Sequence, residues 1–187
     1  MKHFSLLLIF SVLLTFSYAQ QGSSIYINLG GTATNFTGED VSDSDLRYTW
    51  HGGVLIDNPI GQKTRFLTGL QYGQIGDDDN ELNFVTLPLQ VGYTLFDNFR
   101  IYIGPSVNVR SNVNAPDGIP EGDFKDQFTQ VTIAGLATVS YTSGKFLFYT
   151  QYQHDLQNAF EENLGTSFKG YKQHIKLGIG FKLFEEK

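Results

Sequence analysis

The residues with the widest chemical scope lie close together near the C-terminal end of the chain. His154 and Asp155 are adjacent, and Ser167 and His174 follow a short distance later. A histidine oriented by a carboxylate can remove a proton from a serine hydroxyl and so generate a nucleophile for hydrolysis. No nucleophile motif surrounds Ser167. We therefore interpret these residues as polar residues at the ends of predicted strands, on the rim of a barrel, and keep a hydrolase as the alternative.

A second candidate site is the acidic segment 77–81. Asp77, Asp79 and Glu81 offer the hard carboxylate oxygens that suit Ca²⁺, and Asp77 and Asp79 could also join the histidines in a hydrolytic site. The segment does not match an EF-hand loop. Most of the chain's acidic residues fall between the predicted strands, so we favour a solvated acidic loop over a metal site.

The composition excludes several classes of protein. The chain has 187 residues and a formal net charge of −6, which argues against a nucleic-acid partner because phosphate binding requires a basic face. Cysteine is absent, so there is no disulfide or thiolate metal site. His51 has no second histidine or cysteine at ligand spacing, and phosphate-loop, dinucleotide and zinc motifs are missing. We therefore expect neither a metal ion nor a cofactor.

The first 19 residues have the pattern of a cleavable secretory signal peptide. A short basic start at 1–3 precedes a mostly apolar run at 4–16, and 17–19 places small residues where signal peptidase reads them. The apolar run is shorter than the roughly 20 residues that a spanning helix requires. We predict cleavage after Ala19 and a single domain over residues 20–187.

The mature chain shows alternation of apolar and polar residues with a period of two, which indicates β-strands with two different faces. The predicted strands span 25–34, 46–56, 64–74, 84–94, 99–110, 129–141, 146–155 and 173–183. Pro88 and Pro105 lack a backbone N–H, so we expect bulges or local breaks there. The pattern predicts an all-β, eight-stranded, antiparallel up-and-down barrel.

The predicted connections alternate between long and short. They span 35–45, 57–63, 75–83, 95–98, 111–128, 142–145 and 156–172. Short periplasmic turns and long extracellular loops are typical of bacterial transmembrane barrels. An even number of strands then places both termini on the periplasmic side.

Alternation alone also fits a secreted, soluble, lipocalin-like ligand-binding barrel. Three features favour a barrel surrounded by lipid. The apolar face ends repeatedly in aromatic residues suited to interfacial girdles, and the first strand lacks the Gly-x-Trp of lipocalins. The last strand also carries a pattern that resembles the insertion signal of outer-membrane proteins. Its residues are Lys176, Gly178, Phe181 and Leu183.

Three short segments carry a family resemblance. They are Phe-Val-Thr-Leu-Pro-Leu-Gln at 84–90, Ile-Gly-Pro at 103–105 and Thr-Gly-Leu-Gln-Tyr at 68–72. The mature chain resembles the outer-membrane β-barrels that include PorT-like and OmpX/OmpA-like proteins. The resemblance implies a barrel of the bacterial cell envelope, often from Bacteroidetes and related to the porin family, without implying a common activity. Outer-membrane proteases and lipid-A deacylases carry their sites at such a rim, which defines the hydrolase alternative.

The face opposite the apolar one is polar and basic. Its candidate lumen residues are Arg47, His51, Arg65, Arg100 and Arg110. Eight strands leave an interior just wide enough for side chains to fill. We therefore expect a filled lumen rather than an open pore.

Together these observations predict a non-enzymatic outer-membrane barrel with a structural, adhesive or envelope/export-accessory role. The expected partners are outer-membrane lipid and lipopolysaccharide, the barrel-assembly machinery during insertion, and an unidentified protein bound through the extracellular loops. The sequence does not identify that protein.

Overall fold

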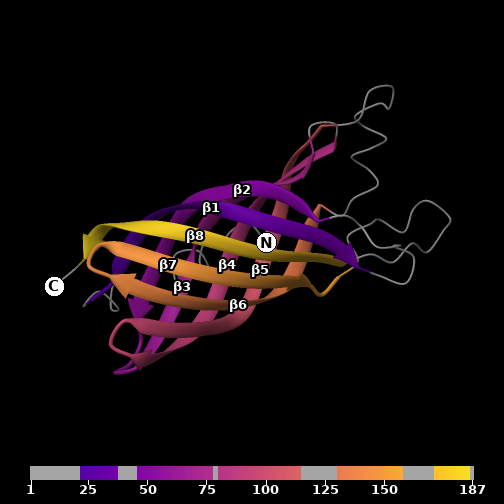
Figure 1. Cartoon of the computed structure of the whole chain (residues 1–187). Coiled ribbons are helices and arrows are strands. Elements are labelled where there is room, and N and C mark those ends of the chain that lie inside the picture. The colour runs from indigo at the N-terminus through magenta and orange to yellow at the C-terminus, as the bar shows by residue number, and fades with distance from the viewer. Residues whose placement is uncertain (1–21, 38–45, 78–79, 115–129, 158–170, 186–187) are drawn as a thin grey trace, which may run out of the picture.

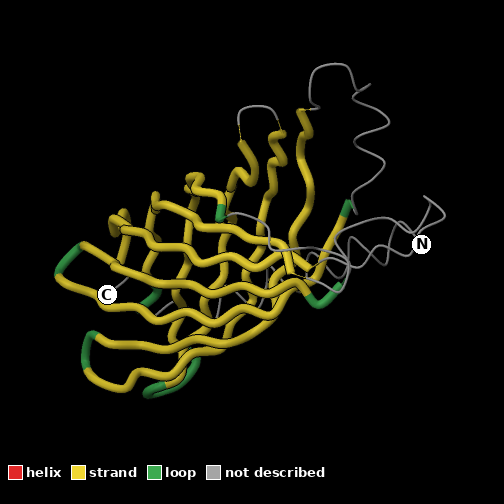
Figure 2. The backbone as a smooth tube through the Cα atoms, turned by 45° about the vertical axis from the view of Figure 1, so that its right-hand side comes forward, coloured by secondary structure: helices red, strands yellow, loops and turns green. Residues whose placement is uncertain are grey.

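Eight antiparallel strands form a closed barrel in the computed structural model (Figure 1). The structure describes residues 22–37, 46–77, 80–114, 130–157 and 171–185, so the predicted signal peptide lies outside the described residues. The strands are β1 (Ser24–Thr37), β2 (Arg47–Pro59), β3 (Thr64–Asp77), β4 (Asn80–Phe96), β5 (Phe99–Asn114), β6 (Val131–Ser143), β7 (Phe146–Asp155) and β8 (Tyr171–Glu185). Each strand pairs with its neighbour in sequence, and β8 pairs with β1 (Figure 2). The predicted eight-stranded up-and-down barrel is confirmed.

The two ends of the barrel differ in their connections. Three short connections, 60–63, 97–98 and 144–145, lie at one end, which we call the turn end. The start of β1 and the end of β8 also meet there, since Ser24 pairs with Glu185. The other end, which we call the loop end, carries the connections between β1 and β2, β3 and β4, β5 and β6, and β7 and β8.

The predicted long connection at 75–83 is wrong. β3 and β4 continue toward each other until only residues 78–79 separate them, and Gly76 pairs with Glu81 and Asp77 with Asn80. The strict alternation of long and short connections therefore fails at this hairpin. This stretch consists mostly of Gly, Asp, Asn and Glu and lacks the period-two pattern of apolar residues, so the sequence did not mark it as a strand although its backbone is paired.

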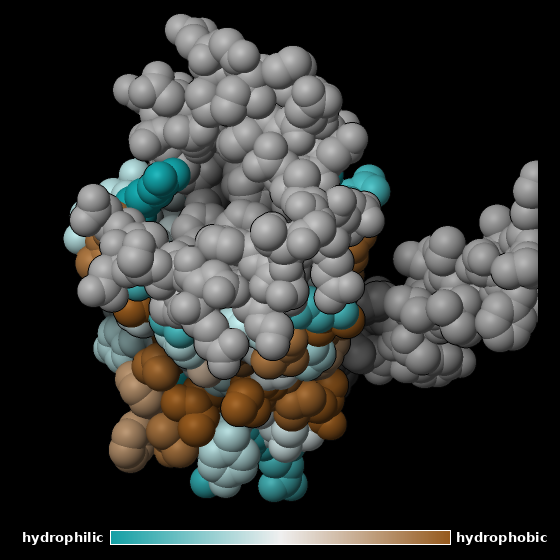
Figure 3. Space-filling model, turned by 90° about the vertical axis from the view of Figure 1, so that its right-hand side faces the viewer, coloured by the Kyte–Doolittle hydropathy of each residue, from teal (hydrophilic) through white to brown (hydrophobic). Residues whose placement is uncertain are grey.

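Polar side chains fill the interior of the barrel, and apolar side chains cover its outside. In β7, buried and exposed residues alternate from Phe146 to Tyr152, with Gln151 inside and Tyr152 outside. Figure 3 shows hydrophobic residues gathered on the flank of the barrel. This distribution is the reverse of a soluble barrel, which would bury its apolar face, so the lipocalin-like alternative does not fit.

A small apolar cluster interrupts the polar interior. Leu67 and Leu147 are 3% and 4% exposed, although both break the expected alternation by lying on the polar face. They belong to one cluster with Leu55 and Tyr102, among others. Apolar side chains therefore fill part of the interior alongside the polar ones.

The two prolines interrupt strand pairing without shifting its register. The β3–β4 pairs resume at Gln71↔Thr86 after Thr68↔Leu89, and the β4–β5 pairs resume at Val91↔Ile103 after Pro88↔Ser106. The register is the same before and after each gap, so neither strand contains an extra residue there. These are therefore local breaks rather than bulges.

The outward position of Ile179 leads to a test of the faces. Ile179 lies near the middle of β8 and is 51% exposed. An Ile179→Arg substitution should lower the free energy of unfolding by roughly 2–4 kcal/mol, because it places a cation against the lipid midplane. Urea unfolding in lipid vesicles measures this change. Tyr48→Arg, near the loop end, is the matched control and should cost only about 0–1 kcal/mol. Equal costs at the two positions would contradict the assignment of depth and face.

Candidate functional site: the barrel interior and the lipid-facing surface

A charged cluster occupies the interior at the turn end. The Asp57 carboxylate accepts hydrogen bonds from Nε of Arg65 at 2.8 and 2.9 Å and from Nη1 of Arg100 at 3.0 Å. Arg100 also donates to the hydroxyl of Thr142, and Arg65 donates to the carbonyl of Gly22. Asp57 is 1% exposed, so a single buried carboxylate balances two arginines from different strands.

A second hydrogen-bonded layer crosses the centre of the barrel. The Tyr149 hydroxyl of β7 donates to Oδ1 of Asn28 on β1 at 2.8 Å and lies 2.7 Å from Nε2 of His51 on β2. Gln71 of β3 donates to both Asn28 and Tyr149. Because Tyr149 uses its proton on Asn28, the network assigns the His51 proton to Nε2, and Nδ1 then accepts from Thr32 at 2.9 Å. Side chains from four strands are thereby joined across the interior.

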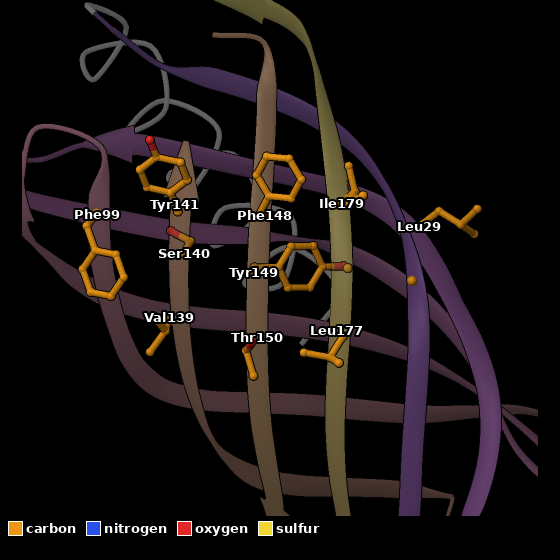
Figure 4. Close-up of a pocket in the computed structure, with 12 residues that line it drawn as sticks. Leu29, Phe99, Val139, Ser140, Tyr141, Phe148, Tyr149, Thr150, Leu177 and Ile179 are labelled. Carbon is orange, nitrogen blue, oxygen red and sulfur yellow. The ribbon is translucent and has the colours of Figure 1, made fainter. Parts of the chain in front are cut away.

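Two glycines make room for this central layer. A Cβ atom at Gly178 would lie 2.4 Å from the ring of Tyr149, and one at Gly30 would lie 2.7 Å from Cε1 of His51. Figure 4 shows the Tyr149 side chain reaching from β7 to β8, with Leu177 and Ile179 on either side of Gly178 in the sequence. A shallow apolar groove lies over these glycines on the outer surface, with Leu29, Phe99, Phe148 and Leu177 among its walls. The close approach of ring and backbone therefore requires glycine at both positions.

Amides and hydroxyls continue the interior toward the loop end. Thr138 donates to Oε1 of Gln90 at 3.0 Å and accepts from Nε2 of Gln151 at 3.1 Å. One level further, Asn108 accepts from Thr86 at 2.9 Å and from Gln153 at 3.1 Å. The Thr138–Gln90 and Gln153–Asn108 bonds link strands that are not neighbours in the barrel, which indicates a filled cross-section.

The residues proposed for hydrolysis are held in other interactions. Asp155 is fully buried and forms an ion pair with Lys172 at 3.2 Å, whereas His174 is hydrogen-bonded to the Thr34 hydroxyl at 2.9 Å. His154 is only half-buried and stacks on Tyr171, with 6.1 Å between ring centroids. In the part of the chain that the structure describes, no hydrogen bond joins either histidine to Asp155, and Ser167 lies outside that part. The geometry does not assemble the hydrolase arrangement.

The other predicted lumen and metal residues have these positions. His51 is fully buried, and Arg65 and Arg100 are part-buried in the cluster at Asp57. Arg47 and Arg110 are half-buried on inward-facing positions of β2 and β5. Asp77 and Glu81 lie in strands but their side chains are not described, and Asp79 lies outside the described residues. Within the described residues, no group of three metal-ligating side chains is present.

The four residues of the insertion pattern divide between the two faces of β8. Lys176 is 6% exposed and points into the barrel, and Gly178 lies against Tyr149. Phe181 and Leu183 are 41% and 60% exposed on the outside. Recognition by an assembly machinery stays a prediction, while the structure gives Lys176 and Gly178 a second role inside the barrel.

Aromatic side chains lie on the outer surface near both ends. Near the turn end, Phe146 packs against Phe181 with 5.7 Å between ring centroids, and Phe96 lies near Phe99 at 6.4 Å. Toward the loop end, Trp50 contacts Tyr72 at 5.6 Å. An apolar band with aromatic residues toward both borders is the pattern of a membrane barrel. Among the described residues, no helix is both long and apolar enough to cross a bilayer.

The sequence alone did not reveal how the interior side chains pair. Tyr149, Asn28 and Gln71 were assigned to the polar face, but their convergence on His51 depends on the barrel's closure. The only signal in the sequence was that all three fall on the inward face by the period-two alternation, since none belongs to a recognised motif.

Comparison with known proteins identifies the fold. No family model and no curated protein matches the sequence. The structure is similar to that of Ail, the attachment invasion locus protein of Yersinia pestis, with 8% identity and a TM-score of 0.56, covering 88% of this chain and 99% of Ail. Neisserial surface protein A is similar at 12% identity and a TM-score of 0.54, covering 87% of this chain and all of that protein. The chain therefore has the fold of eight-stranded outer-membrane barrels.

The central layer predicts a specific loss of stability. Tyr149→Phe removes the donor to Asn28 and the acceptor for His51 and Gln71, which leaves buried polar groups unpaired. The free energy of unfolding should fall by about 1–3 kcal/mol. Tyr152→Phe is the matched control, because Tyr152 lies on the same strand and is 44% exposed on the outer surface. Equal urea midpoints for the Tyr149 variant and the unsubstituted protein would show that the network contributes nothing.

Proposed function

We propose that the mature chain is a closed, non-enzymatic outer-membrane β-barrel that carries its loop-end segments on the cell surface. The interior supports this proposal most directly. Hydrogen bonds link non-adjacent strands at several levels, and the charged cluster at Asp57 occupies the turn end. A lumen filled in this way suits a structural platform better than a conduit.

The outer surface supports the location. Large apolar side chains such as Leu29, Ile103 and Leu177 are 64%, 72% and 61% exposed. In water, a protein with such an apolar surface would aggregate. Outer-membrane lipid and lipopolysaccharide would cover it instead. Export through the signal peptide at 1–19 and insertion through the end of β8 complete this proposal.

The role of the loop end is proposed as adhesive, structural or accessory to the envelope and its export systems. Ail is the attachment invasion locus protein of its organism, and the neisserial barrel is a surface protein. At 8% and 12% identity these descriptions offer an analogy in fold only. We propose that the loop end binds a protein partner.

The sidedness of the barrel can be measured with single cysteines, because the natural chain has none. Gln130 at the loop end and Asn98 at the turn end are both exposed. On whole cells, an impermeant maleimide should label Gln130→Cys and not Asn98→Cys. Both variants should react after lysis, which controls for folding and access. Labelling of position 98 alone on intact cells would reverse the topology.

The closed lumen can be tested in planar bilayers. The purified mature protein should show no stable single-channel steps, because interior side chains fill the cross-section. A double variant, Tyr149→Ala with Arg100→Ala, removes one large side chain from the central layer and one from the charged cluster at Asp57. Its conductance shows what a barrel with a widened lumen would give. Reproducible steps from the unsubstituted protein that vanish in Arg100→Ala would replace the closed platform with a small anion channel.

A further inference from the structure

Strand β8 places three basic side chains inside the loop-end half of the barrel. Lys172, His174 and Lys176 alternate along the strand and are 3%, 3% and 6% exposed. Alternate residues of a strand project to the same side, so all three point inward. What this region can bind depends on which group pairs with the charge of each basic side chain.

Two of these residues have identifiable partners. Lys172 forms an ion pair with Asp155 at 3.2 Å, and its ammonium lies 3.9 Å from the ring centroid of Phe84. Nδ1 of His174 is hydrogen-bonded to Thr34. Asp155 thus neutralises Lys172, and the histidine is accommodated by a neutral hydroxyl.

Lys176 has neither a hydrogen bond nor an ion pair with any described residue. Its neighbours across the ladders are Thr32 on β1, which is bonded to His51, and Gln151 on β7, whose amide donates to Thr138. Among the residues that the structure describes, no carboxylate forms an ion pair with it. An ammonium buried without a counterion is costly, and a small anion beside it would offset that cost.

A cavity of about 20 Å³ has the Lys176 side chain in its lining. Its walls include Lys176, Lys172, His174, Gln153 and Asn108, with the ring of Phe84 nearby. The volume accommodates a water molecule or a monatomic ion and excludes sugars, nucleotides and polyatomic phosphates. Size and charge therefore select a very small ligand.

The amides in the wall can also present a donor. Gln153 donates Nε2 to Oδ1 of Asn108, and Oε1 of Gln153 is buried without a partner. Exchanging the oxygen and nitrogen of both amides keeps their mutual hydrogen bond, with Asn108 now donating. The unpartnered position of Gln153 then becomes an N–H, while Thr86 and Thr132 can still bond to Asn108. An anion would select this arrangement.

We propose that the loop-end interior holds a single monatomic anion, of the halide class, bound by Lys176 with the Gln153 amide. The anion supplies the negative charge that the described interior lacks beside Lys176. It acts as a structural counterion within the filled barrel rather than as a transported species.

Bromide provides a direct test, because its anomalous scattering locates it in crystals. Crystals of the mature protein grown in bromide should show an anomalous peak in the cavity within contact distance of Nζ of Lys176. The Lys176→Met variant should show none. A water peak without anomalous signal in the unsubstituted protein would overturn the proposal in favour of a hydrated lysine.

Unfolding in vesicles gives an independent readout. At constant ionic strength, replacing gluconate with chloride or bromide should raise the urea midpoint of the unsubstituted protein with the logarithm of halide concentration. The halide dependence should disappear in Lys176→Met and persist in Lys182→Met, an inward lysine of the same strand near the turn end. Identical midpoints in gluconate and halide for the unsubstituted protein would contradict the site, and crystals of that protein decide the matter if Lys176→Met does not fold.

Discussion

The pairing of β1 with β8 is the constraint on which the rest of the structure depends. All fourteen residues of β1 find partners on β8 from Ser24↔Glu185 to Thr37↔Tyr171, with one irregularity between Ile25 and Tyr26. In lipid, an unpaired edge would leave backbone N–H and C=O groups without water or protein partners, at a cost of several kcal/mol each. Closure therefore makes the apolar exterior possible, and it also brings residues distant in sequence into one interior.

Closure in turn determines what the interior can contain. Tyr149 reaches Asn28 across 121 positions of sequence, and it does so over Gly178, where a side chain would collide with its ring. The small residue on one strand and the large one on its neighbour fix their relative register, since a one-residue slip would exchange inward and outward side chains. Packing and hydrogen bonding thus act on the same pair of strands.

Charge compensation explains the distribution of function between the inside and the ends. Asp57 pairs with Arg65 and Arg100, and Asp155 pairs with Lys172, so these interior charges are committed to structural ion pairs. Of the residues that suggested hydrolysis in the sequence, Asp155 is part of this compensation, whereas His174 is hydrogen-bonded to Thr34 and His154 stacks on Tyr171. In the function that we propose, recognition of a partner falls to the loop end.

The sequence by itself determined the all-β class, the existence of eight strands and the inward or outward direction of residues such as His51 and Ile179. It could do so because side-chain direction in a strand follows a local period of two. It misplaced the hairpin at 75–83, because that stretch of Gly, Asp, Asn and Glu lacks the apolar–polar period although its backbone remains paired. It also could not show that Leu67 and Leu147 fill the interior, or that Lys176 is left without a partner while Lys172 has Asp155. These features depend on the register of non-neighbouring strands around a closed barrel, and only the tertiary structure brings those strands together.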